Sequence, residues 1–217
     1  IALSVILPHE ERIVSPFFVT RGIGAQLPGL AAGGRMPWAA GVFNDWLDAD
    51  LDREENGTDY AGRLTGLVYE SPSRTDYLHF GLGLRRVGSD DGVMRFSGRP
   101  ESNVADKFVD TGNFAGDHAD EVLVELLWSH RQFSLLAERV EAHVDAPASG
   151  DPRFSGYYGT ASWILTGESR PYVRASGYAG GLSPNRRGGA LELALRYSHL
   201  DLTDGALDGG ELDKWSY

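Results

Sequence analysis

The chain has 217 residues and a formal net charge of −11, from 31 acidic and 20 basic side chains. This acidic balance, with no basic stripe to offset it, argues against nonspecific binding of nucleic acid. The absence of cysteine excludes disulfide scaffolds and thiolate metal sites. No run approaches the roughly 18 apolar residues of a transmembrane helix, which leaves open a membrane protein built from strands.

Short alternating segments recur along the chain. Stretches of about ten residues alternate apolar with polar or small side chains, as in strands of a membrane barrel, and turns rich in Gly, Pro, Asp and Ser separate them. Alternation predicts strands, because successive side chains leave opposite faces of a pleat. In chain order we expect strands over 19–26, 36–46, 59–69 and 76–86, a hairpin over 122–142, and strands over 154–166, 188–199 and 211–217.

The segment over 77–85 shows the two faces most clearly. Its apolar side chains share one face and the rest share the other: Leu78, Phe80, Leu82 and Leu84 against His79, Gly81, Gly83 and Arg85. A soluble sandwich would bury the leucines between its sheets. A transmembrane barrel turns the leucines toward lipid and lines a wet lumen with small and charged side chains. The glycines and the arginine favour the barrel.

Two further features agree with a barrel. Aromatic side chains gather near segment ends, as an interfacial girdle requires: Trp38, Trp46, Tyr60, Tyr77, Trp128, Trp163 and Tyr197. Connections also differ in length, with short turns over 70–74 and 129–131 and long acidic stretches over 45–59 and 201–213. Barrels keep long loops at one end and short turns at the other. We therefore predict an all-β, antiparallel transmembrane β-barrel, with most of the negative charge in loops.

Arginines supply the candidate site. Arg95 and Arg99 are four residues apart, which would place both on one face of a strand with Ser97 between them. Guanidinium groups suit oxyanions because they donate two parallel hydrogen bonds and keep their charge. A cationic ladder for anions would add further residues expected on lumen faces: Arg85, Arg63, His79 and Arg196. The alternative is that these arginines pair with Glu125, Glu138, Glu192 and other wall carboxylates and stiffen the barrel.

Two other motifs have weaker functional interpretations. Asp110-Thr111-Gly112 resembles the active-site loop of aspartic proteases, in which two carboxylates share a proton, but the chain has no second such triplet and an Asx turn is the simpler interpretation. The segment 48–52 has the alternating carboxylates of a calcium loop without its later glycine and glutamate, which favours a solvated acidic loop. We expect no catalytic residue, metal or cofactor.

Several stretches together resemble one known family. They occur in family order over nearly the whole chain: Glu11-Arg12; Gly34 to Asn44; Leu78 to Gly83; Arg99-Pro100-Glu101; Phe108 to Gly112; Ser155 to Tyr158; Leu165 to Glu168 with Arg170-Pro171-Tyr172; and Gly189 to Tyr197. On these motifs the sequence resembles the bacterial outer-membrane phosphate-selective porins of the O and P type. The family resemblance strengthens the barrel prediction.

The resemblance implies a sixteen-stranded, trimeric, anion-selective channel in the outer membrane of Gram-negative bacteria, surrounded by lipid and lipopolysaccharide. Residues 1–217 would form a partial porin barrel domain of about eight strands, because the chain begins and ends within the pattern; the N-terminal strands and the closing C-terminal strands would lie outside it. By resemblance, Arg95 and Arg99 fall in the family's pore-facing arginine-rich segment. A constriction lysine would fall near Val5, where there is none, so another oxyanion or anions in general are alternatives to phosphate.

Three other functions remain as alternatives. A soluble β-sandwich could bind carbohydrate or protein through its tyrosines and tryptophans, with its leucines buried. An aspartic protease homodimer could act through Asp110. A plugged outer-membrane protein would share the barrel fold and conduct no ions. The predicted function is a diffusion channel for inorganic anions, which is not an enzyme.

Overall fold

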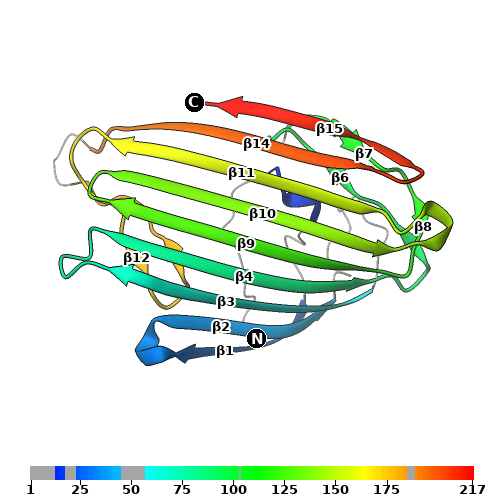
Figure 1. Cartoon of the computed structure of the whole chain (residues 1–217), viewed down its shortest axis with the longest axis horizontal. Coiled ribbons are helices and arrows are strands. Elements are labelled where there is room, and N and C mark those ends of the chain that lie inside the picture. Colours follow the sequence, from blue (N-terminus) through cyan, green and yellow to red (C-terminus); the bar gives the residue numbers. More distant parts are fainter. Residues whose placement is uncertain (1–12, 18–22, 45–56, 103, 185–188) are drawn as a thin grey trace.

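The computed structural model describes residues 13–17, 23–44, 57–102, 104–184 and 189–217. Within them, nine long strands form one antiparallel sheet. In sheet order they are β1 (Ile23–Ala31), β2 (Met36–Asn44), β3 (Thr58–Glu70), β4 (Tyr77–Gly88), β9 (His118–His130), β10 (Phe133–Asp145), β11 (Arg153–Ile164), β14 (Glu192–Asp204) and β15 (Leu207–Ser216). Figure 1 shows them side by side between the two edges, β1 and β15. The antiparallel all-β prediction is confirmed, with nine long strands rather than about eight in an open sheet.

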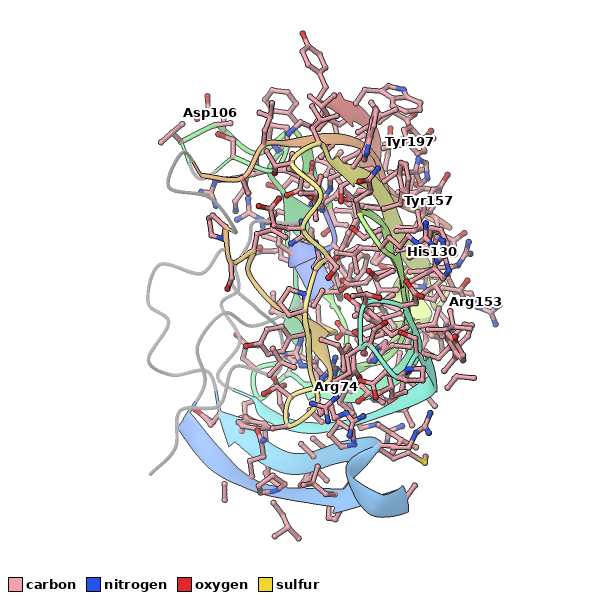
Figure 2. The ribbon with its side chains drawn as sticks, turned by 90° about the vertical axis from the view of Figure 1, so that its left-hand side faces the viewer. Arg74, Asp106, His130, Arg153, Tyr157 and Tyr197 are labelled. Carbon is pink, nitrogen blue, oxygen red and sulfur yellow. The ribbon has the colours of Figure 1, made fainter. Side chains whose placement is uncertain are left out.

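The sheet is curved, and two connections lie within the curve (Figure 2). These connections are the segment 89–117, between β4 and β9, and the segment 165–191, between β11 and β14; residues 103 and 185–188 within them lie outside the described residues. We call the side of the sheet that they cover the inner face and the opposite side the outer face. Short 3-10 turns complete the described elements: η1 (Ser15–Phe17), η2 (Ala32–Gly34) and η3 (Pro147–Ser149). No described helix has the length and apolar character needed to cross a membrane.

The predicted hairpin over 122–142 is confirmed. It consists of β9 and β10, which pair from Phe133 with His130 through to Asp145 with His118. Arg131 at the turn adopts a left-handed conformation with a φ of 54°. The alternation of apolar and polar residues therefore predicts the strands correctly, although Leu, Glu and Ala favour a helix.

The first predicted strand is displaced. We expected a strand over 19–26, but β1 runs from Ile23 to Ala31 and contains Pro28. Proline cannot donate to a neighbouring strand, so its presence in sequence argues for a strand end. β1 has a partner on one side only, β2, among the described residues. An edge strand tolerates proline, because one side of its backbone is not needed for pairing.

The acidic stretch over 201–213 is not a long loop, contrary to prediction. β14 and β15 continue through it and are joined by a tight turn at Gly205 and Ala206. The acidic residues are therefore strand residues. The prediction of long connections at one end only is also wrong, since 165–191 leaves the end of the sheet opposite to 89–117. It is long because it packs on the inner face.

The outer face is apolar and exposed over most of the sheet. Leucines of alternate positions lie on it, and Leu84 is 54% exposed. The other exposed apolar side chains of this face include Phe80, Leu82, Val122, Val124, Trp128, Leu135, Trp163, Leu193 and Leu195. A soluble sandwich would have buried these side chains, and the leucine burial that it predicts is not observed. This pattern is typical of a sheet that faces lipid.

The apolar core lies on the inner face. The segment 89–117 forms two small strand pairs, β5 (Val93–Met94) with β8 (Phe114–Ala115) and β6 (Ser97–Gly98) with β7 (Val109–Asp110). Its buried side chains pack against those of β9, β10, β11 and β14: Met94, Phe96, Val109 and Phe114 against Leu123, Val140, Phe154 and Leu200. Burial of this apolar surface stabilises the packing of the segment against the inner face of the sheet, by roughly 25 cal/mol per Å² buried.

A second, smaller cluster holds the other segment. The segment 165–191 contains β12 (Tyr172–Val173) and β13 (Tyr178–Ala179). Tyr172 and Ala179 pack against Leu67 and Tyr77 of the wall, and the rings of Tyr172 and Tyr77 are 5.1 Å apart. Both connections therefore narrow the space that the curved sheet encloses.

Candidate functional site

The inner face carries a group of buried or half-buried charged side chains. Alternation in β3, β4, β9, β10 and β14 turns these residues away from the leucines of the same strands. The members are Asp59, Arg63, His79, Arg85, Glu121, Glu125, Glu138 and Arg196, and the neutral Ser198 accepts a hydrogen bond from Arg196. Buried charges are costly unless they are paired and hydrogen-bonded. The partners of each cation therefore determine how much positive charge the inner face presents to an ion.

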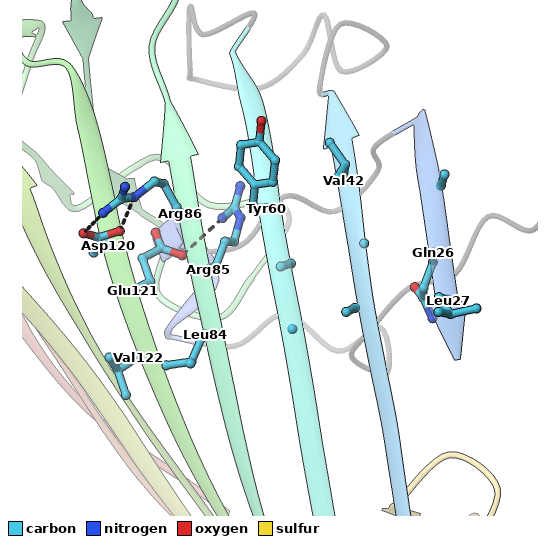
Figure 3. A pocket seen from close by; sticks show the side chains of 15 residues that line it. Gln26, Leu27, Val42, Tyr60, Leu84, Arg85, Arg86, Asp120, Glu121 and Val122 are labelled. Carbon is cyan, nitrogen blue, oxygen red and sulfur yellow. Dashed lines mark hydrogen bonds and ion pairs between the residues drawn. The ribbon is translucent and has the colours of Figure 1, made fainter. Parts of the chain in front are cut away.

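Arg85 lies between two carboxylates. Its guanidinium contacts Asp59 of β3, and its Nη1 lies 3.3 Å from Glu121 Oε2 of β9. Nη1 also donates to the backbone carbonyl of Phe17, at 2.7 Å. The next residue, Arg86, points to the outer face and forms a separate ion pair with Asp120 (Figure 3). Arg85 thus joins two strands of the wall to the N-terminal turn η1.

A second cluster centres on Glu125 of β9. Its Oε1 accepts hydrogen bonds from Arg63 Nη2 at 2.6 Å and from His79 Nε2 at 3.2 Å. The predicted alternative that arginines pair with wall carboxylates is confirmed for this pair. Gly81 lies directly across from Glu125, and a Cβ at that position would meet Glu125 Oε1 at 1.9 Å. The glycine gives the carboxylate its space.

The same cluster holds the segment 165–191. Arg63 Nη1 donates to the carbonyl of Ser176 and Nη2 to that of Gly177, both at 2.9 Å. His79 Nδ1 lies 2.6 Å from the hydroxyl of Tyr172. Since an ionised carboxylate only accepts, Nε2 of His79 carries the proton of its hydrogen bond to Glu125. Burial raises the pKa of Tyr172 to about 12, so its hydroxyl stays protonated.

Arg95 has a carboxylate partner within its own segment. Its Nε donates to Asp110 Oδ1 at 2.8 Å, and its Nη2 contacts Oδ2. This two-point contact with Arg95, assisted by the Gly112 N–H, holds the pKa of the Asp110 carboxyl below its usual range. The Gly112 N–H donates to Oδ1 at 2.9 Å, which is the Asx turn given as the simpler interpretation. An ionised Asp110 beside an arginine is unlike a carboxyl that shares a proton.

Arg95, Ser97 and Arg99 do not lie on one strand, contrary to prediction. β5 ends at Met94 and β6 contains only Ser97 and Gly98. Ser97 pairs in register with Asp110, while Arg99 Nε donates to the carbonyl of Ala105 at 3.1 Å. Arg95 and Arg99 flank the two residues of β6, so the predicted single strand through both arginines is not formed.

Arg196 of β14 joins the segment 89–117 to the part of the sheet next to the β15 edge. Its Nη2 lies 2.6 Å from Glu101 Oε1, and its guanidinium carbon lies 3.9 Å from the ring centre of Tyr158. Lys214 of β15 reaches the other oxygen of Glu101 at 3.4 Å. Glu101 therefore anchors the inner segment to two strands through two cations.

The inner face thus combines cations and carboxylates that come from β3, β4, β9, β10 and β14. The structure brings Arg63 and His79 together, but it places Arg85, Arg95 and Arg196 in separate ion pairs. Further pairs link Arg170 with Glu192 and Arg174 with Glu70. Such a surface is polar, hydrated and of mixed sign, which suits weak contact with small ions rather than tight binding.

Sequence reasoning missed several of these groups. Glu121 lies on the same face as Glu125, opposite Val122 and Val124, so alternation could have identified it. Glu101 and Tyr172 lie in connections with no periodicity; both stand in family-like motifs, Arg99-Pro100-Glu101 and Arg170-Pro171-Tyr172, but those motifs do not identify their partners. Asp48, Asp50 and Asp52 of the calcium-like spacing lie outside the described residues.

Comparison with known proteins agrees with this architecture. A protein of Caulobacter vibrioides described as uncharacterized is 26% identical over 204 residues, which cover 82% of this chain and 39% of that protein. The chain thus spans less than half the length of this relative. The sequence profile described as "Phosphate-selective porin O and P" matches residues 13–217, nearly the whole chain. The chain therefore belongs to the phosphate-selective porin O and P family.

Proposed function

We propose that this chain forms part of the wall of an outer-membrane channel through which small anions diffuse, and that it is not an enzyme. One observation carries the proposal: a single antiparallel sheet of nine strands exposes apolar side chains on its outer face and places charged side chains on the inner face of β3, β4, β9, β10 and β14. Family membership supports the same function. Because the chain spans 39% of its Caulobacter relative, the proposed channel would contain further strands besides these nine.

Electrostatics supply the mechanism. Cationic side chains along a narrow wet path lower the barrier for anion entry, and binding must stay weak enough for release. The proposed path uses Arg63, His79, Arg85, Arg95, Arg99 and Arg196, with Ser97 as a neutral donor. The neighbouring carboxylates weaken the field of the arginines. This balance supports a general anion path, with phosphate, pyrophosphate and other oxyanions as its candidate substrates.

The assembly is part of the proposal. Within the described residues, β1 and β15 each pair on one side only, and a membrane does not tolerate unpaired backbone groups at a sheet edge. Further strands of the full-length protein would close the sheet into a barrel, and the resemblance to the family suggests a homotrimer in the outer membrane. Lipid and lipopolysaccharide would then cover the exposed leucines. The segments 89–117 and 165–191 would narrow the lumen from opposite ends.

Planar-bilayer recording of the full-length protein tests the proposal. Under a potassium chloride gradient we expect a zero-current potential with the sign of an anion-selective channel. We also expect the chloride conductance to fall when phosphate is added. The double variant Arg95→Glu and Arg99→Glu should shift selectivity toward cations. Arg139→Glu is the control, because Arg139 contacts Glu141 on the outer face. Unchanged selectivity in the double variant would overturn the arginine path, and absence of conductance would favour a plugged barrel.

A further inference from the structure

Three metal-ligating side chains meet on the outer face of the hairpin formed by β14 and β15. His199 Nδ1 lies 3.1 Å from Asp213 Oδ1 and 3.6 Å from Glu211 Oε1. The ligand atoms of all three residues lie within 4.8 Å of one another. Register explains the cluster, since His199 pairs directly with Asp213 and the next position of the same face pairs Asp201 with Glu211.

Aromatic side chains hold two of the three residues in place. The ring of Tyr157 lies 4.8 Å from that of His199, and the Tyr197 hydroxyl donates to Asp213 Oδ1 at 2.5 Å. Figure 2 shows Tyr157 and Tyr197 on the side of the sheet away from the inner segments. Groups of this kind orient the ligands of metal sites. The side chains of Glu211 and Asp213 are 61% and 54% exposed, and they lie nearer the turn at Gly205 and Ala206 than the outer-face Leu193 and Leu195 do.

The charge distribution points to a cation. Asp201 and Glu211 are direct cross-strand neighbours, and like charges in this position destabilise a sheet. Lys214 does not offset them, since it lies on the inner face and pairs with Glu101. A divalent cation between the strands would relieve the repulsion and join β14 to β15.

We propose that His199, Glu211 and Asp213 bind a divalent metal ion of the zinc class. Ligand atoms about 2.0 Å from a tetrahedral zinc ion are roughly 3.3 Å apart, and the two distances from His199 Nδ1 lie on either side of that value. Zinc accepts one imidazole and two carboxylates, and water takes the open fourth position. A metal ion binds an imidazole through an unprotonated ring nitrogen, and Nδ1 is the nitrogen of His199 that faces the two carboxylates.

Zinc titration of the full-length protein, purified in detergent and stripped with a chelator, tests the site. Calorimetry should show one strong site per chain, and cobalt should give the visible absorption of a tetrahedral ion. His199→Ala and Glu211→Gln should each weaken zinc binding by about tenfold or more. His130→Ala is the matched control, since His130 is an exposed histidine near a single carboxylate, Asp76.

Two results would overturn the site. One is zinc binding of equal strength in the wild type and in His199→Ala; the other is the absence of a strong site in the wild type. Glu211→Gln changes an exposed side chain and should fold normally, so it remains informative if His199→Ala misfolds. Calcium binding that survives His199→Ala would indicate carboxylates alone and would also contradict the proposal. None of these outcomes depends on the selectivity of the channel.

Discussion

His79 and Tyr172 are separated by 93 positions in sequence, yet their side chains are joined by a hydrogen bond of 2.6 Å. His79 belongs to the wall and is fully buried, whereas Tyr172 belongs to the inner segment 165–191. The bond therefore reports directly on whether that segment is docked on the wall.

Replacing Tyr172 with phenylalanine should loosen this segment. The ring would still pack against Tyr77, but Nδ1 of the buried His79 would lose its partner, at a cost of about 1–3 kcal/mol. Hydrogen–deuterium exchange over 165–191 should increase, and unfolding in detergent should occur at a lower temperature. Tyr69→Phe is the control, because Tyr69 is an exposed tyrosine of β3. Equal exchange in both variants would contradict the role of the bond.

The segment 89–117 should loosen in acid. Arg95 lowers the pKa of Asp110, so this pair stabilises the folded state fully above the unfolded pKa of about 3.9. The contribution is lost as the pH falls through the lower folded value. Exchange protection of the segment, corrected for intrinsic rates, should therefore decrease below about pH 4. In Asp110→Asn this decrease should be absent; if it persists unchanged, another group is responsible.

Removing the charge of Glu125 should affect stability and selectivity together. Glu125→Gln leaves Arg63 without its carboxylate in a buried position, which should cost about 3 kcal/mol of unfolding free energy. It also makes the inner face more positive, so the zero-current potential of the channel should shift toward anions. Glu141→Gln on the outer face should change stability by less than about 0.5 kcal/mol. A shift toward cations in Glu125→Gln would contradict the proposed path.

Gly81 should not tolerate a side chain. In Gly81→Ala the added Cβ would lie 1.9 Å from Glu125 Oε1. The Glu125 carboxylate would therefore have to move away from Arg63 and His79. We expect a loss of about 1–3 kcal/mol in unfolding experiments. Gly159→Ala in β11 is the control, because a Cβ there meets nothing within 4 Å. Similar stability of the two variants would show that Glu125 can move without cost.

The sequence predicted the wall well, because alternation is a local property of each strand. Leu82 and Leu84 lie on the outer face, and His79 and Arg85 lie on the inner face, as expected. Placement of a residue on a face did not predict its partner. Arg85 was expected to contact anions, but its carboxylates come from β3 and β9, and only the register of three strands brings them together.

The inner segments could not be predicted from the same signal. The four strands of 89–117 have two residues each, which is too short for any periodicity to appear. The spacing of Arg95 and Arg99 suggested one continuous strand, whereas the strand is interrupted between β5 and β6. Composition was equally ambiguous at Gly205 and Ala206, where acidic neighbours suggested a loop but the strands continue to the turn.

The packing of Met94, Phe96 and Phe114 against Leu123, Val140 and Phe154 has a consequence for the shape of the passage. Where these side chains meet, the wall is dry, so ions cannot travel along it. In a closed barrel the water-filled route at that level would run off the central axis, beside the segment 89–117. The residues that border this segment, rather than those equally spaced around the barrel, would then control which ions pass.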